Sequence, residues 1–276
     1  MNMPSKFTKL FIATCKDYPN ANKALEHLKE LLLKRGLECE FVIWQELFAK
    51  DMDKALILPL AVWDYALHYE KFKQFLGEFS FTTPASVLLK NSKKDYLFEL
   101  ERFNLPIIPS VLLENFKANA HSFKKPIIKP LVGQSGRGVR FLDDRAIGAD
   151  EFPQGAIIQP FIASIYELGE LCLVFFEKHF QYAVHRRVQK DWRANSNYGV
   201  QTALFKDVKE QWIELALRAL EVFSPQPLLY ARVDILPQKD GSIFINEVEL
   251  IEPSLYLNLC LNASENFAKR LIESYF

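Results

Sequence analysis

The sequence carries no excess charge of either sign and no long apolar run. Lys+Arg and Asp+Glu both number 34 in 276 residues, so the net charge is +0, which argues against the basic footprint of a nucleic-acid-binding protein. No stretch approaches the roughly 20 apolar residues that cross a bilayer. The short apolar run near the N-terminus meets Lys16 and Asp17 too soon for a secretory signal. We therefore expect a cytoplasmic protein with no nucleic-acid partner and no membrane partner.

Cysteine is also scarce, with four residues in the whole chain. They form no C-x-x-C pair and no histidine-spaced zinc pattern, which excludes the common structural zinc sites. In a chain of this size without a signal peptide, a disulfide framework is equally unexpected. We expect reduced thiols at Cys15, Cys39, Cys172 and Cys260.

What the sequence does have is an alternation of strand-like and helix-like segments. The pattern predicts strands over residues 7–14, 38–44 and 55–59 and helices over 21–35 and 65–76, with Gly36 ending the first helix. Such an alternation is typical of a parallel α/β domain, here extending to about residue 90. The later segments read as α+β, with a helix over 93–104, strands over 139–142, 156–162, 171–176 and 180–187, a helix over 206–223 and a last helix from about residue 262.

A predicted hairpin near the C-terminus brings several charges to one face. Asp240-Gly241 is a two-residue turn signal between alternating runs. Counting back from it places Asp234 opposite Glu247 and Arg232 opposite Glu249, on one face because side chains repeat every second residue. The other face, residues 231, 233, 235, 244, 246, 248 and 250, is predicted to pack on a core.

Three carboxylates around one guanidinium repel unless a cation joins them, since opposed Cβ atoms lie only about 4.5–5.5 Å apart. Ligands that are all oxygen indicate Mg²⁺ or Mn²⁺ rather than zinc. The metal ligands predicted in this way are Asp234, Glu247 and Glu249. A solvated strand face with salt bridges to lysines elsewhere is the alternative, and a slip of one residue would move every side chain.

A glycine loop follows an apolar strand that ends in Lys129. The loop runs from Gly133 to Gly138 and leads into another strand, without the ending of a P-loop or the spacing of a dinucleotide fingerprint. It reads either as a mobile surface turn or as a flap whose backbone N–H groups approach phosphate oxygens. Lys129 favours the flap, because a cation at the end of a buried strand needs an anion.

Further charged and aromatic residues suit small-molecule binding. A basic cluster over residues 186–193 suits phosphate or carboxylate, or is a solvated loop. Trp63, Asp64 and Tyr65 follow a strand of the parallel domain, where ligands bind beyond the carboxyl ends. Core packing of the two aromatic residues and helix capping by Asp64 are the alternatives.

Taken in order, these features resemble the ATP-grasp superfamily. The matching elements are Lys94, Lys129, the glycine flap, the segment Ile158-Gln159-Pro160-Phe161-Ile162, Glu170, and Asp234 with Glu247-Val248-Glu249. The stretches ATCKDYP, VWDY, KDYLFELERFNLPIIPS, IIQPFI with GELCLVFF, and YARVDI with EVELIEPSL look like the subgroup typified by D-cycloserine synthase. Two stretches depart from that subgroup. Leu60-Ala61-Val62 replaces an Arg-Ser-Thr-like triplet, and Tyr198-Gly199-Val200 stands where Gly-Gly is common.

The resemblance implies an N-terminal α/β domain on the substrate side (1–90), a small ATP-grasp subdomain with the flap (91–158) and a large subdomain with the metal site (159–276). It implies ATP and Mg²⁺ (or Mn²⁺) as cofactors. The ATP-binding residues it implies are Lys94, Lys129, Gly133, Gln134, Ser135, Gly136, Gly138, Gln159, Pro160, Phe161, Ile162 and Glu170. The catalytic residues would be Arg186, Arg193 and Arg232, and the substrate residues Trp63, Asp64, Tyr65, Glu252 and Ser254.

The activity implied is an ADP-forming carboxylate–amine ligase that acts through an acyl phosphate on a small amino-acid-like substrate. The acid and the amine would be separate molecules or parts of one molecule that is cyclised. Two alternatives remain open: a kinase for a small molecule that uses the same site, and a non-catalytic nucleotide-binding protein. A homodimer also stays open at this stage.

Overall fold

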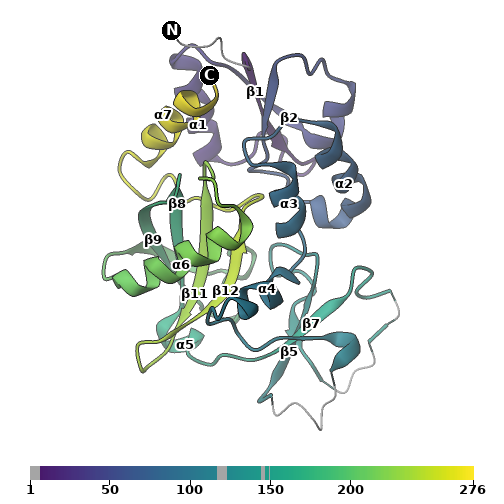
Figure 1. Cartoon of the computed structure of the whole chain (residues 1–276), viewed down its shortest axis with the longest axis vertical. Coiled ribbons are helices and arrows are strands. Elements are labelled where there is room, and N and C mark those ends of the chain that lie inside the picture. The colour runs from purple at the N-terminus through teal and green to yellow at the C-terminus, as the bar shows by residue number, and fades with distance from the viewer. Residues whose placement is uncertain (1–6, 117–122, 144–146, 149) are drawn as a thin grey trace.

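The computed structural model describes residues 7–116, 123–143, 147–148 and 150–276. These residues form three sheets, one in the N-terminal part and two in the rest of the chain (Figure 1). Among the helices of these residues, none combines the length and the apolar character of a membrane span. All four cysteines are free, as predicted.

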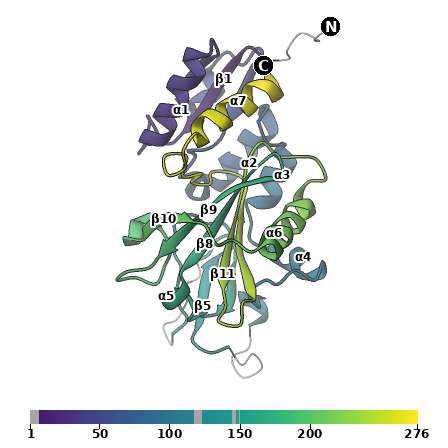
Figure 2. The same ribbon diagram turned by 90° about the vertical axis from the view of Figure 1, so that its left-hand side faces the viewer.

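The N-terminal sheet is parallel, with strand order β2-β1-β3. Its strands are β1 (Lys9–Thr14), β2 (Glu38–Ile43) and β3 (Ala55–Leu58). One face packs on α1 (Lys23–Lys34) and on the C-terminal helix α7 (Ala263–Tyr275), and the other packs on α2 (Tyr69–Glu78). Figure 2 shows α7 lying beside α1, so that the end of the chain returns to its beginning. Two 3-10 helices, η1 (Trp44–Ala49) and η2 (Tyr65–His68), complete this part.

The largest sheet is antiparallel, with the order β10-β9-β8-β11-β12. Its strands are β8 (Glu170–Phe176), β9 (His179–Arg187), β10 (Gln201–Phe205), β11 (Ala231–Pro237) and β12 (Ile243–Glu249). Helix α6 (Glu210–Phe223) buries one face, where alternate residues of β8 and β11 form an apolar core. The opposite face carries the charged side chains described below.

The third sheet has the order β4-β7-β5-β6 and holds the glycine loop. Its strands are β4 (Val111–Leu112), β5 (Pro126–Pro130), β6 (Arg140–Phe141) and β7 (Ala156–Pro160). Antiparallel pairing of β5 with β6 makes the predicted strand–glycine loop–strand hairpin. The remaining elements are α3 (Ala85–Asn91), α4 (Tyr96–Arg102), η3 (Leu113–Asn115), α5 (Ile165–Leu168) and η4 (Ser196–Tyr198).

Several local predictions differ from the structure. The expected helix over 93–104 begins only at Tyr96, so Lys94 lies in the turn after α3 rather than on a helix. The helix expected from residue 206 begins at Glu210, and α3, β4 and β10 had no predicted counterpart. The last helix begins at Ala263, close to the expected position, but the Asn262 side chain does not cap it, and Glu265 of its first turn pairs with Arg35.

The acidic hairpin has the predicted pairing but not the predicted turn. Gln238 N–H donates to Ser242 O at 2.8 Å, so three residues lie between the paired ends instead of two. A β-bulge between Asp234 and Ile235 offsets the extra residue of the turn. Beyond the bulge the predicted pairs therefore form, Arg232 with Glu249 and Asp234 with Glu247. The unpaired residue of the bulge is Asn246 on β12. The bulge turns Phe244 and Asn246 away from the α6 core, which corrects the prediction that placed them on that face.

Candidate active site

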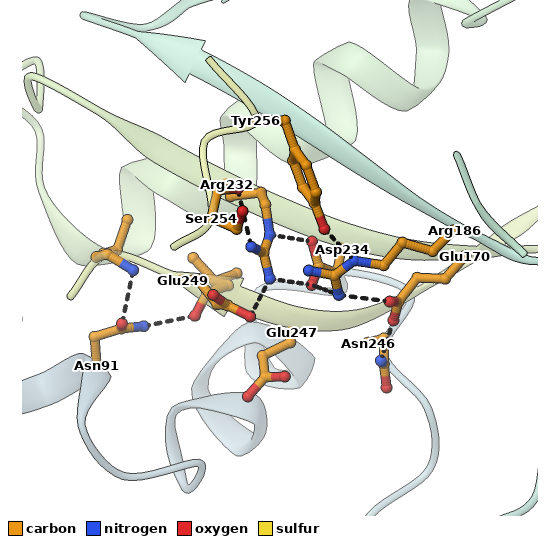
Figure 3. Close-up of polar contacts among 12 residues, drawn as sticks. Asn91, Glu170, Arg186, Arg232, Asp234, Asn246, Glu247, Glu249, Ser254 and Tyr256 are labelled. Carbon is orange, nitrogen blue, oxygen red and sulfur yellow. Dashed lines mark hydrogen bonds and ion pairs between the residues drawn. The ribbon is translucent and has the colours of Figure 1, made fainter. Parts of the chain in front are cut away.

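Four charged side chains of the acidic hairpin face one another (Figure 3). Arg232 Nε donates to Asp234 Oδ1 at 2.8 Å and Arg232 Nη2 to Asp234 Oδ2 at 2.9 Å, a bidentate pair that is almost fully buried. The same guanidinium also binds Glu249. Ligand oxygens of Asp234, Glu247 and Glu249 all lie within 4.8 Å of one another. This spacing and an all-oxygen donor set fit a hard divalent cation such as Mg²⁺.

A second arginine extends this cluster toward β8. Arg186 Nη1 lies 2.9 Å from Glu170 Oε2 and 3.3 Å from Asp234 Oδ2, and Arg186 Nε donates to the Tyr256 hydroxyl at 2.6 Å. All of these groups are on the face of the sheet opposite α6 (Figure 3). Two buried guanidiniums therefore compensate Asp234.

The bulge brings Asn246 into the same cluster. Its Nδ2 donates to Glu170 Oε1 at 2.6 Å, and its Oδ1 accepts from Lys129 Nζ at 3.0 Å. Asn246 was missed as a site residue, although a polar residue on an expected core face was a usable signal. It connects the end of β5 with the acids of the large sheet.

The two predicted lysines reach the cluster from the side of the glycine loop. Lys94 Nζ lies 2.5 Å from Glu247 Oε1 and also donates to Gly133 O at 3.1 Å. Among the residues that the structure describes, no carboxylate lies within salt-bridge distance of Lys129, whose Nζ donates to the amide oxygen of Asn246. Burial lowers the pKa of Lys129 to about 8, and the Glu247 charge only partly opposes this effect. An anion placed beside Lys129 would restore its charge.

The carboxylic acids have unequal proton affinities. Burial raises the pKa of Glu249 to about 7 despite the Arg232 charge, and burial and Glu249 raise the pKa of Glu252 well above its usual range. Burial would also raise the pKa of Asp234, but Arg232 and Arg186 hold it below its usual range. A divalent cation beside Glu249 would favour the charged form of this carboxylate and lower its pKa again.

A cavity of about 630 Å³ contains most of the predicted site residues. Those that line it are Trp63, Tyr65, Lys94, Lys129, Gly133, Gln134, Ser135, Gly136, Pro160, Phe161, Ile162, Glu170, Arg186, Arg193, Arg232, Glu247, Glu249, Glu252 and Ser254. The sequence therefore predicted residues that the fold brings to one cavity, although they come from the two antiparallel sheets and from loops, including the segment after β3.

Four predicted site residues do not line this cavity. Asp64 instead accepts hydrogen bonds from Trp44 Nε1 at 2.6 Å and from Gln45 Nε2 at 3.1 Å. It makes no cap bond to the following helix, contrary to the alternative reading. The Gln159 side chain donates to Ser110. Gly138 occupies a turn with φ +72. The Asp234 carboxylate accepts hydrogen bonds from Arg232 and Arg186.

The glycine loop and the residue that follows it contact residues 193–198, which are called the basic loop below. Tyr198 donates to Gly136 O at 3.2 Å, and Arg193 Nη1 donates to Val139 O at 3.2 Å. The Arg193 guanidinium lies 3.6 Å from the centre of the Tyr198 ring. On the other side, Gln134 bonds to the backbone of Trp63. The loop is therefore held over the cavity from two sides.

An aromatic group adjoins the Gln159–Ile162 segment and was not predicted. The ring of Trp192 lies 5.4 Å from that of Phe161 and 5.1 Å from that of Phe141, measured between centroids. Trp192 and Phe161 both line the cavity, so this end of the site is apolar. Nothing in the spacing of the sequence signals that Trp192 reaches β6.

A second cavity of about 910 Å³ adjoins the first. It lies between the start of α1 and residues 253–265. The two cavities share Asn22, Trp63, Ser254 and Tyr256 in their walls. Tyr256 has a left-handed backbone (φ +51), which is uncommon for a bulky residue and typical of functional sites.

Comparisons with known proteins agree with this geometry. A family model described as the N-terminal domain of D-cycloserine synthetase DcsG matches residues 10–85. The cycloserine biosynthesis protein DcsG of Streptomyces lavendulae is 26% identical over 268 residues, which cover 86% of this chain and 89% of that protein.

Solved structures extend the likeness to the whole fold. The crystal structure of D-cycloserine synthetase DcsG has a TM-score of 0.82 at 21% identity, covering 97% of this chain and 99% of that one. D-alanine–D-alanine ligase from Bacillus anthracis in complex with ATP has a TM-score of 0.66 at 16% identity, covering 98% and 96%. The predicted resemblance and the predicted fold are confirmed.

Proposed function

We propose that this protein is an ATP-grasp ligase, which joins a carboxylate to an amine in an ATP- and Mg²⁺-dependent, ADP-forming reaction. The observation that carries the proposal is the meeting of two lysines with Glu247 and Glu249 in one cavity beside a glycine loop, with Asp234 at ligand spacing from these two acids. Lysines and backbone N–H groups suit phosphates, and the acids suit the cation that accompanies them. The similarity to D-cycloserine synthetase over most of the chain supports a ligase acting on a small molecule.

The chemistry requires an activated acid, because a carboxylate is a poor electrophile at neutral pH. Transfer of the γ-phosphoryl group to the carboxylate gives an acyl phosphate, and ADP leaves. The amine then attacks the acyl carbon, the C–N bond forms, and inorganic phosphate departs. The protein must position the reactants, stabilise charge and exclude water from the intermediate.

The nucleotide would lie between the glycine loop and the large sheet. Lys94 and Lys129 would contact its phosphates, with the loop over them. The backbone of residues 159–162 would hold the adenine, next to the apolar wall made by Phe161 and Trp192. Glu170 would face the ribose hydroxyls, held in place by Asn246 and Arg186.

Asp234, Glu247 and Glu249 would hold the Mg²⁺ (or Mn²⁺). When bound, the cation neutralises charge on the phosphates during phosphoryl transfer. Arg232 orients Asp234 and Glu249 through its guanidinium. Arg186 and Arg193 would orient the transferred phosphoryl group and the acyl phosphate, since a planar guanidinium matches such oxygens.

The substrate would occupy the side where the two cavities meet. Ser254 lies in the shared wall, and Arg232 Nη1 donates to its carbonyl oxygen at 3.1 Å. Trp63 lies in the same wall, and Tyr65 and Glu252 line the nucleotide cavity nearby. An ammonium group suits the aromatic face and carboxylate available there, which favours an amino-acid-like substrate. A substrate site at this shared wall is compatible with the cyclisation of one molecule and with the joining of two molecules.

The proposal is tested by release of ADP across a panel of amino acids and related acids, each paired with amines and Mg²⁺. Hydroxylamine is then added to the acids that respond, because it converts an acyl phosphate to a hydroxamate. A hydroxamate that requires ATP is the expected result. Stable phosphorylation of a hydroxyl group without a hydroxamate would indicate the kinase, and ATP binding without any ADP would indicate the non-catalytic protein.

A matched pair of variants ties the activity to the acids. Glu247→Gln is expected to abolish hydroxamate formation, because it removes a charge from the cation site. Glu167→Gln is the control, since that carboxylate forms an exposed pair with Lys239. Equal activity in both variants would contradict the site.

Two expectations about the whole protein remain proposals. A cytoplasmic location would suit an enzyme that consumes ATP and small molecules. A homodimer is tested by light scattering coupled to size-exclusion chromatography, in which a mass near twice 32.0 kDa is expected.

A further inference from the structure

Near Glu249 the outer edge of β12 is bonded by side chains, whereas further back Ile245 N–H donates to the Pro106 carbonyl oxygen at 2.7 Å. β12 is the last strand of its sheet, so the backbone groups on its outer edge need other partners. Asn91 Nδ2 donates to Val248 O at 2.8 Å, and Asn91 Oδ1 accepts from Leu250 N–H at 2.9 Å. Figure 3 shows this carboxamide reaching the backbone of the strand that carries Glu249. Asn91 thus binds the residues on both sides of Glu249.

Tyr96 completes the same edge. Its hydroxyl accepts from Val248 N–H at 3.0 Å and lies 3.2 Å from Val248 O. Asn91 and Tyr96 are both buried. A single carboxamide offers one donor and one acceptor at the spacing of a neighbouring strand, which a carboxylate or an alkyl group cannot do.

The segment between these two residues carries Lys94. Its backbone N–H donates to Leu131 O at 2.9 Å, next to the glycine loop. Its side chain pairs with Glu247 on β12. Residues 91–96 therefore fix, in one short stretch, both the lysine proposed for the phosphates and the strand that carries two of the three acids.

We propose that Asn91 is a positioning residue for the cation site, which holds β12 so that Glu247 and Glu249 face Asp234 at ligand spacing. The inference rests on the proposed function, because it assumes that these acids bind the cation that accompanies ATP. Asn91 acts through the backbone of β12. Residues that orient metal ligands typically change metal affinity by about 10- to 100-fold when they are removed.

The test compares Asn91→Leu with Lys90→Met. Leucine has the same branching at Cγ and makes neither hydrogen bond. Lys90 belongs to the same helix, and its Nζ donates to Val222 O at 2.7 Å and to Glu99 at 2.9 Å, away from β12. The Lys90→Met substitution therefore removes contacts of α3 but leaves the hydrogen bonds between Asn91 and β12 in place.

Binding of Mn²⁺ is measured by electron paramagnetic resonance in the presence of a non-hydrolysable ATP analogue. We expect Asn91→Leu to weaken Mn²⁺ binding about 10-fold, and Lys90→Met to bind as the wild type does. Hydrogen exchange of the Leu250 amide should quicken in Asn91→Leu alone. If Asn91→Leu is not recovered folded, Tyr96→Phe removes only one hydroxyl from the same edge and should give a smaller loss in the same direction.

Mn²⁺ affinity equal to that of the wild type in Asn91→Leu or Tyr96→Phe would overturn the positioning role. The same conclusion follows if Lys90→Met weakens Mn²⁺ binding to the same extent as Asn91→Leu, since general loosening of α3 would then explain both losses of affinity. Wild-type protein that binds no Mn²⁺ with the nucleotide analogue would overturn the proposed function itself. Binding in the wild type together with no effect of the variants overturns only the role of Asn91.

Discussion

Lys94 and Glu247 form an ion pair in which Nζ lies 2.5 Å from Oε1, between the turn before α4 and strand β12. One partner is proposed to bind phosphate and the other to bind the cation. Each residue compensates the charge of the other while neither ligand is present, which avoids a partly buried unpaired charge. Arrival of Mg²⁺ and ATP would give each residue a new partner of opposite charge.

Lys94→Met should therefore weaken ATP binding. A hydrogen bond to a charged group contributes roughly 1.5–3 kcal/mol, so we expect the dissociation constant for ATP to rise about 10- to 100-fold in calorimetry. The control is Lys93→Met, because the neighbouring lysine forms only a surface pair with Asp95 at 3.6 Å. The proposed role would be lost if both variants bound ATP alike.

The register of the acidic hairpin shows how far sequence reasoning reached. The alternation of charged and apolar residues identified the face of Arg232 and Asp234, because a strand has a period of two. The turn was wrong by one residue, and the bulge at Asn246 was not foreseen. The two errors cancel at Asp234 and Glu247, so the acids were paired correctly while Phe244 and Asn246 were assigned to the wrong face.

Residues that act through tertiary contacts could not be predicted in this way. Asn91 reaches β12 across more than half the chain, and Tyr256 meets Arg186 only after β9 and the C-terminal segment have packed. Neither position has a local pattern. Lys94 and Lys129 were found because each adjoins a recognisable segment, although Lys94 turned out to precede its helix.

The contact between the glycine loop and the basic loop predicts the effect of Gly136→Ala. Gly136 has φ +68, and a Cβ there would lie 2.9 Å from Tyr198 Cε2. The methyl group would strain the loop and displace Tyr198, so we expect the KM for ATP to rise with little change in the KM for the acid. Steady-state kinetics with each substrate varied in turn measures the difference.

Gly77→Ala is the matched control for that substitution. Gly77 lies in α2, and a Cβ there would meet nothing within 4 Å. Alanine in a helix is favoured over glycine by roughly 0.5–1 kcal/mol, so the melting temperature should rise slightly while both KM values stay unchanged. A KM for ATP in Gly136→Ala equal to that of the control would show that the loop does not close on the nucleotide.

The depressed pKa of Lys129 predicts proton uptake on nucleotide binding. Burial brings this pKa to about 8, against 10.5 for a free lysine. Phosphates beside Nζ would favour the charged form, so at pH 8.5 ATP binding should take up a proton. Calorimetry in buffers of different ionisation enthalpy measures this uptake, which should vanish in Lys129→Met and persist in Lys124→Met, a change at an exposed lysine.

The same group fixes the sign of a stability change with pH. Between about pH 8 and 10.5 the unfolded chain binds more protons at this lysine than the folded chain, so its contribution to the free energy of unfolding rises with pH. Urea unfolding across this window should show a steeper rise for the wild type than for Lys129→Met. Equal slopes would contradict the lowered pKa.

Arg232 is expected to be the most costly single charge to remove from the site. Its guanidinium is almost fully buried and binds both oxygens of Asp234 as well as Glu249. Among the described residues, Arg232→Met leaves Asp234 with Arg186 as its one ion-pair partner, and breaking a buried pair costs about 3–5 kcal/mol. Urea unfolding should show a loss of this size in the absence of divalent cation. The exposed pair of Lys239 with Glu167 supplies the control, since its loss in Lys239→Met should cost less than about 1 kcal/mol.

Addition of Mg²⁺ with a non-hydrolysable ATP analogue should recover part of the stability of Arg232→Met, because a cation can take the place of the guanidinium between the acids. A loss no greater than that of Lys239→Met, or no recovery with the cation, would show that Arg232 does not organise the acids.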